Sequence, residues 1–250
     1  MPSPPSQVSP SPVAAFRSLH HDRAPGDPLV LPGPWDAASA RAFEAAGFPA
    51  LATPSAGVAA SLGYEDGATP ADEMFAAVSR IARSVSVPVS ADVEGGYGLP
   101  PKQLVARVLE TGAVGVNLED SEAGALKDPH RHAEWLAEVR AEAGDALFLN
   151  ARVDTYVRGL TGAAALADAI TRSRLYAEAG ADCVYPILIP PDHLPPLRAE
   201  ITAPVNALSK PDGPPPAELG RLGATRVTFG PGLLHRTLAE VRRIAEEVGG

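Results

Sequence analysis

A glycine that follows a helix-like segment and precedes an apolar one occurs four times in this sequence. The four stretches read EAAGFPALAT, LETGAVGVNLED, AEAGADCVYP and GRLGATRVTFG. The end of a helix commonly needs a residue in the left-handed conformation, which glycine adopts without steric cost. We therefore expect helices to end, and strands to follow, at Gly47, Gly112, Gly180 and Gly223.

Further apolar segments lie between these four, and together they make eight candidate strands. The strands cover residues 29–33, 49–53, 87–92, 114–119, 147–152, 182–187, 203–208 and 225–230. The linking segments look helical; between residues 69 and 85, Met74, Val78 and Ile81 share one helical face. Largely apolar strands that alternate with helices are typical of a parallel sheet covered by helices. Eight such units predict an α/β fold, a closed (β/α)8 TIM barrel over residues 25–250, with a doubly wound open sheet as the alternative.

The composition limits the classes of partner. A formal net charge of −9 and a pI near 5.1 argue against nucleic acid, because phosphate binding needs a basic surface. No apolar run approaches the roughly 18 residues of a membrane span, so we expect a soluble protein without a membrane partner. The single cysteine, Cys183, excludes an intramolecular disulfide and a cysteine zinc site. This cysteine usage fits a cytoplasmic location.

Proline and serine dominate the start of the chain, MPSPPSQVSPSP. This stretch has neither the basic start nor the apolar core of a secretory signal. We expect residues 1–24 to form a disordered lead-in to the barrel. His20 and His21 lie in this lead-in, and we expect both to be solvated and without a functional role.

The carboxyl ends of the predicted strands carry the candidate functional residues, because barrels of this kind place their chemistry there. Asp92 and Glu94 end the third strand in ADVEGGYG, Glu119 ends the fourth, and Arg152 lies at the end of the fifth. Carboxylate ligands without histidine or cysteine suit a hard cation, above all Mg²⁺. The planar fork of Arg152 suits a substrate carboxylate or an oxyanion. The alternative is a structural network of ion pairs at the barrel mouth.

Six stretches together resemble the isocitrate lyase/phosphoenolpyruvate mutase superfamily. They read PGPWDAASARAFEAAGFPALAT, SAGVAASLGYEDG, ADVEGGYG, GVNLEDS, LNARVDTY and PVNAL. The resemblance implies a Mg²⁺-dependent barrel, with Mn²⁺ as a substitute, that makes or breaks a C–C or P–C bond next to a 2-oxo acid or its enolate. It implies that Asp92 binds the metal directly and that three other carboxylates hold its water ligands, namely Asp66, Glu94 and Glu119.

The same resemblance implies which residues contact the substrate and how the chain assembles. Arg152 matches the arginine that stabilises the substrate's carboxylate and enolate oxygen, and it forms the expected catalytic set with Asp66 and Glu119. The expected substrate-binding residues are Trp35, Asp36, Thr53, Ser55, Arg152 and Asn206. The expected ligand is a small 2-oxo or 2-hydroxy acid. The expected assembly is a homo-oligomer, by resemblance a tetramer, that uses the apolar side of the last helix, LLHRTLAEVRRIAEEV.

The loop after the fourth strand departs from the family pattern. Isocitrate and methylisocitrate lyases carry a Lys-Lys-Cys-Gly-His loop there, whereas this chain has EDSEAGALKDPHRH without a cysteine, which excludes those two activities. The loop also lacks the lysine and asparagine arrangement of the mutase and of phosphonopyruvate hydrolase. Its acid–base candidates are Glu122, Lys127, His130 and His132, of which we expect the two histidines to be solvated.

A second departure lies after the second strand. Pro54 stands where the family has a serine whose hydroxyl holds the substrate carboxylate, and proline offers neither a hydroxyl nor an N–H group. Thr53 and Ser55 are the neighbours expected to compensate. The carboxylate pocket is therefore expected to differ in detail from that of the family.

The leading hypothesis is a Mg²⁺-dependent lyase or hydrolase that acts on a small dicarboxylate, such as oxaloacetate or an alkylmalate-like acid. A barrel that binds a 2-oxo acid without turnover is one alternative. A phosphonopyruvate- or phosphoenolpyruvate-type mutase or hydrolase is another. A different barrel enzyme with a phosphate site is a further option, because the glycine-rich turn TFGPGLL follows the last strand.

Overall fold

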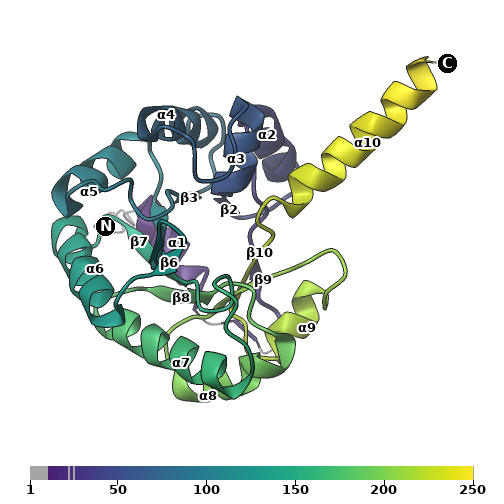
Figure 1. Cartoon of the computed structure of the whole chain (residues 1–250). Coiled ribbons are helices and arrows are strands. Elements are labelled where there is room, and N and C mark those ends of the chain that lie inside the picture. The colour runs from purple at the N-terminus through teal and green to yellow at the C-terminus, as the bar shows by residue number, and fades with distance from the viewer. Residues whose placement is uncertain (1–10, 22, 25, 250) are drawn as a thin grey trace, which may run out of the picture.

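A barrel of parallel strands surrounded by helices forms the body of the protein (Figure 1). The computed structural model describes residues 11–21, 23–24 and 26–249. Within them, each of the eight predicted strand segments overlaps an observed barrel strand. These strands are β1 (Leu29–Val30), β2 (Leu51–Ala52), β3 (Val89–Asp92), β4 (Gly115–Glu119), β7 (Phe148–Val153), β8 (Cys183–Pro186), β9 (Asn206–Leu208) and β10 (Arg226–Thr228).

Helices connect the strands, and all but the first and the last of them surround the barrel (Figure 1). They are α1 (Pro12–Ser18), α2 (Ala37–Ala45), α3 (Ser55–Leu62), α4 (Ala71–Ala82), α5 (Pro101–Glu110), α6 (Pro129–Ala143), α7 (Gly162–Glu178), α8 (Leu194–Glu200), α9 (Pro216–Arg221) and α10 (Gly232–Gly249). A 3-10 turn, Pro191–His193, leads into α8. A short antiparallel hairpin, β5 (Ser121–Glu122) and β6 (Ala125–Leu126), projects after β4.

The strands pair in parallel in two arcs, β2-β3-β4-β7-β8 and β1-β10-β9. Backbone contacts close both gaps between the arcs. The Ala52 N–H donates to the Pro32 carbonyl at 3.1 Å, and the Val184 N–H donates to the Pro204 carbonyl at 3.0 Å. The ring of strands is therefore continuous, which confirms the predicted closed barrel and rules out the doubly wound alternative.

The glycines that end the helices have the predicted backbone conformation. The φ angles of Gly47, Gly112, Gly180 and Gly223 are 88°, 84°, 98° and 115°, all in the left-handed region. At Gly180 a side chain would also lack space, because a Cβ would lie 2.8 Å from Arg140 Cγ. These glycines turn the chain from the outer helices back into the barrel wall.

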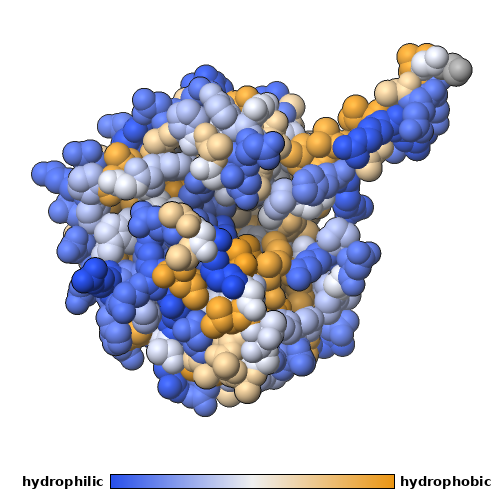
Figure 2. Space-filling model, viewed as in Figure 1, coloured by the Kyte–Doolittle hydropathy of each residue, from blue (hydrophilic) through white to orange (hydrophobic). Residues whose placement is uncertain are grey.

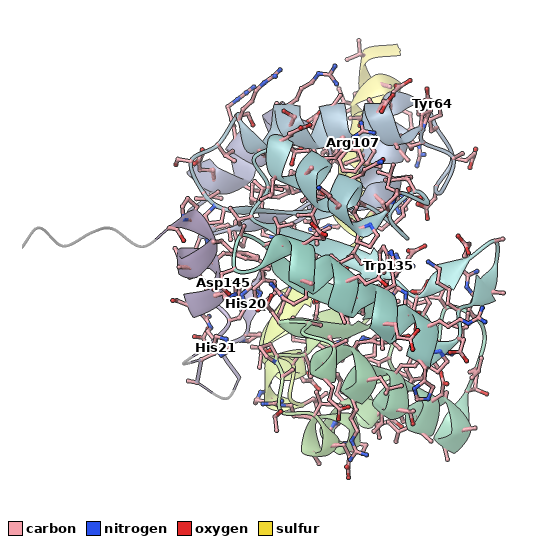
Figure 3. All side chains as sticks on the ribbon, turned by 90° about the vertical axis from the view of Figure 1, so that its left-hand side faces the viewer. His20, His21, Tyr64, Arg107, Trp135 and Asp145 are labelled. Atoms are coloured by element: carbon pink, nitrogen blue, oxygen red, sulfur yellow. The ribbon has the colours of Figure 1, made fainter. Side chains whose placement is uncertain are left out.

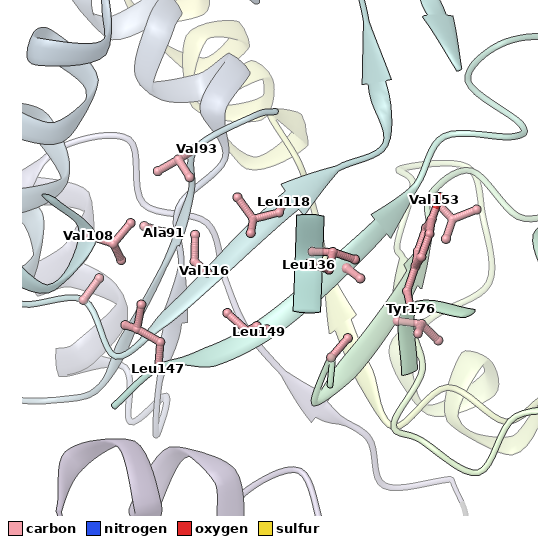
Figure 4. Close-up of a cluster of buried hydrophobic side chains, with 14 of the residues drawn as sticks. Ala91, Val93, Val108, Val116, Leu118, Leu136, Leu147, Leu149, Val153 and Tyr176 are labelled. Atoms are coloured by element: carbon pink, nitrogen blue, oxygen red, sulfur yellow. The ribbon is translucent and has the colours of Figure 1, made fainter. Parts of the chain in front are cut away.

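Side chains alternate strictly between the two faces of the barrel wall. On β4 and β7 the outward residues are apolar and pack with the covering helices; Figure 4 shows Val116, Leu118 and Leu149 among them. The residues between these positions face the barrel interior and include Asn117 and Asn150. The period-two alternation thus builds an apolar layer outside the wall and a polar lining inside it.

Helix α1 closes the amino end of the barrel, so the predicted disordered lead-in is wrong for residues 11–21. Phe16 is fully buried, and its ring meets that of Phe148 edge-on at 5.1 Å. His20, predicted to be solvated, is only 2% exposed and stacks on Phe148 at 4.1 Å. In Figure 3 His20 lies at the same end of the barrel as Asp145, which precedes β7. The segment is ordered because these rings fill the barrel floor; residues 1–10 lie outside the described part.

At the other end of the sequence, α10 extends away from the barrel (Figure 1). Its exposed apolar residues include Leu238, Val241 and Ile244. Among the described residues, no helix combines the length and apolar character needed to cross a membrane.

Candidate functional site at the carboxyl end of the barrel

Asp92, the last residue of β3, has a carboxylate that four hydrogen bonds hold in place. Its Oδ2 accepts from the Ser55 backbone N–H at 3.2 Å and from the Ser55 hydroxyl at 2.9 Å. Its Oδ1 accepts from Asn117 Nδ2 at 2.9 Å and from the Glu94 N–H at 3.2 Å. The Asp92 N–H donates to Thr53 Oγ1 at 3.1 Å. Groups from the start of α3, from β4 and from the turn after β3 therefore fix this carboxylate at the barrel mouth.

Three further carboxylates lie around Asp92 and interact electrostatically with it. Burial raises the pKa of Asp66, and the charge of Asp92 raises it further. Burial, followed by the charges of Asp92 and Asp66, raises the pKa of Glu94 to about 7. Burial also raises the pKa of Glu119 to about 8, although Arg152 opposes this shift. Burial is therefore the main cause of all three shifts, and the neighbouring carboxylates add to it.

The turn that follows β3 has an unusual backbone. Glu94 and Tyr97 have φ angles of 54° and 55°, which are uncommon for residues with a side chain. The Tyr97 hydroxyl donates to Glu94 Oε1 at 3.3 Å. At Gly95, a Cβ would lie 3.3 Å from Lys127 Nζ, so the backbone here approaches the loop after β4 closely. Such strain is typical of functional sites, where the surrounding structure over-determines a residue's position.

Arg152, near the end of β7, is the cation in the middle of these acids. Its Nε and Nη2 donate to Asp154 Oδ1 and Oδ2 at 2.6 and 3.2 Å. Its Nη1 lies 2.8 Å from Glu119 Oε2. A guanidinium has five N–H donors, so donors remain available for a ligand. Burial lowers the pKa of Arg152, but Glu119 and Asp154 outweigh this effect and keep it cationic.

A fully buried layer supports Asp154 from behind. The Asp154 N–H donates to Asp120 Oδ1 at 2.8 Å. The other oxygen of Asp120 accepts from the Tyr176 hydroxyl at 2.7 Å and from Arg172 Nη1 at 3.0 Å. Neither Asp120 nor Asp154 was expected as a site residue, although both lie at strand ends in the sequence. Asp120 holds Asp154, and Asp154 holds Arg152. This positioning role depends on contacts between strands and is not apparent from the sequence.

Two cavities open beside this cluster, and both are lined by Asp66. The first, of about 370 Å³, lies at the centre of the barrel mouth and contains most of the predicted residues: Thr53, Ser55, Asp66, Asp92, Arg152 and Asn206. The second, of about 470 Å³, lies under the β5–β6 hairpin and is lined by Asp66, Glu94 and Glu119. The structure therefore brings the predicted metal-binding and catalytic residues to one end of the barrel.

The hydroxyls expected to compensate for Pro54 have a different partner. The Ser55 hydroxyl donates to the Asp92 carboxylate and orients it, whereas the Thr53 hydroxyl accepts from the Asp92 backbone N–H. Pro54 lines the first cavity as an apolar surface and precedes α3. A ligand at this position therefore meets the proline ring where the family pattern has a serine hydroxyl.

Trp35 and Asp36 do not line either cavity, in contrast to the prediction from family resemblance. Asp36 is the N-cap of α2; its Oδ1 accepts from the Ser39 N–H at 2.7 Å and from the Ser39 hydroxyl at 2.8 Å. Trp35 packs edge-on against Phe43, with ring centroids 6.3 Å apart. Asp36 thus caps the start of α2, and Trp35 packs against the same helix. These structural roles explain both residues without a ligand.

The loop after β4 forms the β5–β6 hairpin over the second cavity. Glu122 and Lys127 both line that cavity. His130 is exposed, as predicted, but His132 is buried and stacks on Trp135 at 5.3 Å. Burial, followed by the charges of Lys127 and Arg172, lowers the pKa of His132 to about 3. The prediction of a solvated His132 is wrong because α6 turns this residue inward.

The acidic cluster has the chemistry of a site for a hard divalent cation. Among the described residues, no three histidine, cysteine or acidic side chains converge closely enough to hold an ion directly. A hard cation such as Mg²⁺ takes one or two carboxylates and keeps several waters. The pKa values of Asp66, Glu94 and Glu119 are raised mainly by burial, and the charge of Asp92 contributes to each shift. The donor set is therefore compatible with one direct carboxylate ligand and a shell of water-mediated ones.

Comparisons with known proteins agree with this geometry. An uncharacterized protein of Mycobacterium tuberculosis is 38% identical over 217 residues, covering 86% of this chain and 81% of that protein. The 2-methylisocitrate lyase of Escherichia coli is 30% identical over 193 residues, covering 70% of this chain and 62% of that protein. A Burkholderia cenocepacia crystal structure, described as a candidate phosphonomutase, superposes with a TM-score of 0.88 at 36% identity, covering 94% of this chain and 98% of that one. The phosphoenolpyruvate phosphomutase family model matches residues 16–249, and the chain belongs to this family, within the isocitrate lyase/phosphoenolpyruvate mutase superfamily.

Proposed function

We propose that the protein is a Mg²⁺-dependent lyase or hydrolase that cleaves the C–C bond next to the C2 carbon of a small 2-oxo or 2-hydroxy dicarboxylate. Oxaloacetate and alkylmalate-like acids are the model substrates, and Mn²⁺ is the substitute cation. One observation carries this proposal: an acidic cluster suited to a cation lies beside Arg152, which keeps N–H donors free in the same cavity.

In this proposal Asp92 binds the cation directly, and Asp66, Glu94 and Glu119 hold its water ligands. The four hydrogen bonds to Asp92 keep its carboxylate in one orientation, so binding requires little rearrangement of the protein. When bound, the cation acts as a Lewis acid toward the carboxylate and C2 oxygen of the substrate. Burial raises the pKa values of Glu94 and Glu119, and neighbouring carboxylates add to both shifts; a bound cation would favour the ionised form of each group.

Arg152 has the second role, that of stabilising negative charge on the substrate. Asp154 and Glu119 hold its guanidinium, which has further N–H donors and lines the first cavity. A donor fixed before the reaction stabilises charge that develops on a C2 oxygen without reorganising. Glu122 and Lys127 line the adjoining cavity and are the groups we propose to exchange protons with the substrate.

A barrel that binds a 2-oxo acid without turnover is the second candidate. It is favoured by the proline at position 54 and by the absence of a thiol from the loop after β4. The only cysteine of the chain, Cys183, is buried in β8, and burial raises its pKa to about 12. These features also argue against cleavage of isocitrate or 2-methylisocitrate by this chain.

Turnover can be tested with a panel of dicarboxylates followed by NMR, with Mg²⁺ and with EDTA. The panel contains oxaloacetate, malate, an alkylmalate and phosphonopyruvate, the last of which tests the mutase or hydrolase alternative. We expect Mg²⁺-dependent cleavage of a dicarboxylate by the wild type and by Asp212→Asn, an exposed control, and its loss in Asp92→Asn. Binding without cleavage of any compound would favour the silent barrel, and cleavage unaffected by EDTA would contradict the proposal.

We also propose that the chain forms a homo-oligomer through α10, with a second copy as the partner. The helix projects from the barrel, and Figure 2 shows hydrophobic residues along one side of it. Leu238, Val241, Ile244 and Val248 are exposed large hydrophobic residues spaced three or four apart. This spacing places them on one helical face, which is typical of a surface that another chain covers.

A further inference from the structure

Arg226, the first residue of β10, is a buried cation without an ion-pair partner among the described residues. Arg226 is only 2% exposed, and neither its Nε nor its Nη1 has a hydrogen-bond partner among the described residues. Within the same part of the chain, no acidic side chain forms an ion pair with it. An unpaired charge in a protein interior is costly, so native structures usually give it a counterion.

The position of Arg226 points to where that counterion lies. Strand alternation places Arg226 on the inner face of the barrel, two residues before Thr228, and both line the first cavity. Below it, the rings of Phe16, His20 and Phe148 close the amino end of the barrel. The open space beside Arg226 is therefore the inner end of the cavity that Asp92 and Arg152 also line.

Two other donors at the inner end of this cavity also lack partners among the described residues. Asn206 uses its Oδ1 to accept from the Thr228 hydroxyl at 3.2 Å, while its Nδ2 is unpartnered. The Ser90 hydroxyl is unpartnered as well. One acceptor, Asn150 Oδ1, is also without a partner. Three donors, one of them cationic, face one cavity, and this excess of donors suits an anion.

The two arginines that line the cavity differ in charge balance. Arg152 pairs with Asp154 and Glu119, whereas Arg226 pairs with no acid among the described residues. We infer that Arg226, with Asn206 and Ser90, binds the second anionic group of the substrate and makes the site selective for dianionic acids. This inference rests on the proposed function, since the first carboxylate is the one assigned to Arg152 and the cation. It assigns a specificity role to a residue outside the acidic cluster.

Matched ligands can measure this selectivity directly. Malate carries a second carboxylate where 2-hydroxybutyrate carries a methyl group, and the two are otherwise the same. Calorimetric titration in the presence of Mg²⁺ gives the affinity of each. We expect the wild type to prefer malate by about 10- to 100-fold, the usual effect of a hydrogen bond to a charged group. In Arg226→Met we expect this preference to disappear because malate binds more weakly, with the 2-hydroxybutyrate affinity changed by less than about threefold. Equal weakening of both ligands, or no change in preference, would overturn the inference.

Thermal unfolding without ligand distinguishes a binding residue from a structural one. Removing an unpaired buried charge is expected to raise the Tm of Arg226→Met by a few degrees. The matched control is Arg140→Met, because Arg140 pairs with Asp182 and donates to the Gly180 carbonyl at 2.9 Å. Its Tm is expected to fall by a similar or larger amount. A fall in the Tm of Arg226→Met comparable to that of the control would identify Arg226 as structural and contradict the inference.

Anomalous diffraction from wild-type crystals soaked in bromide tests the anion site even if neither acid binds. Failure of both acids to bind the wild type would contradict the proposed function, whereas the bromide result concerns Arg226 alone. We expect an anomalous bromide peak within hydrogen-bond distance of Arg226 Nε or Nη1. Ordered water in that position, without bromide, would show that the buried guanidinium is solvated and would overturn the inference.

Discussion

The buried His20 predicts a specific loss of stability in acid. Its Nδ1 lies 2.8 Å from the Phe16 carbonyl oxygen, and its ring stacks on Phe148. Burial, and after it the charge of Arg226, lowers the pKa of His20 to about 3. The folded protein therefore keeps this imidazole neutral at any pH well above 3, whereas the unfolded chain protonates it near pH 6.5.

The sign and size of the effect follow from proton linkage. Between pH 6.5 and pH 3 the unfolded state binds a proton that the folded state does not, so stability falls as the pH falls. At pH 5.5 the free energy of unfolding is lowered by RT ln(1 + 10^(6.5 − 5.5)), about 1.4 kcal/mol, relative to high pH. At pH 7.5 the same expression gives less than about 0.1 kcal/mol. This contribution disappears when position 20 cannot take a proton.

Urea unfolding of the wild type and of His20→Phe, at pH 7.5 and at pH 5.5, measures this contribution. Other titrating groups act equally in both proteins and cancel in the comparison. We expect His20→Phe to gain about 1.4 kcal/mol relative to the wild type on going from pH 7.5 to pH 5.5. The control, His21→Gln, changes the exposed neighbour and is expected to match the wild type at both pH values. A gain below about 0.3 kcal/mol would refute the reasoning, because it would mean that water reaches His20 and that α1 does not close the barrel floor.

Three further changes test other parts of the account. Gly115→Ala would place a Cβ 3.1 Å from Phe16 Cε1 and 3.2 Å from the Phe148 carbonyl oxygen, so we expect urea unfolding to show a loss of about 1–3 kcal/mol. Gly232→Ala, where a Cβ meets no atom within 4 Å, is its control. Asp92→Asn is expected to weaken Mg²⁺ binding about 10- to 100-fold in calorimetry, and an unchanged affinity would remove Asp92 from the metal site. The double substitution Leu238→Glu/Ile244→Glu is expected to yield monomers in light scattering, and a monomeric wild type would contradict assembly through α10.

The sequence alone was sufficient to predict the order of strands and the position of the acidic cluster. Both depend on local signals, namely glycine at helix ends, apolar runs at strands, and charged residues where the runs stop. The observed strands are mostly shorter than predicted; β2 spans Leu51–Ala52 within the predicted 49–53. Register pairs Glu119 with Arg152, so residues expected at adjacent strand ends do become neighbours. The strand ends predicted from the sequence therefore match those that the barrel register brings together at its carboxyl end.

The features that the sequence did not reveal depend on tertiary contacts. Phe16 follows a stretch rich in proline and serine, and packing at the barrel floor gives its ring a buried environment. His132 lies on the buried side of α6, where its ring packs against Trp135 and Tyr176. Arg226 had a usable signal, since it begins a short strand and alternates with Thr228, so the two side chains point to the same face of the barrel wall. The same alternation identifies the inner polar residues Ser90 and Asn150.

Binding of pyruvate in the presence and absence of Mg²⁺ tests the central claim, that the barrel mouth holds a cation and a 2-oxo acid together. Isothermal titration of the wild-type protein with pyruvate, in Mg²⁺ and then in EDTA, gives the result directly. The account predicts saturable binding at one site in Mg²⁺ and its loss in EDTA, with the Asp92→Asn variant behaving in Mg²⁺ as the wild type does in EDTA. Equal binding with and without the cation would show that the acidic cluster around Asp92 is structural, and no binding in either condition would contradict the claim that the barrel mouth holds a 2-oxo acid.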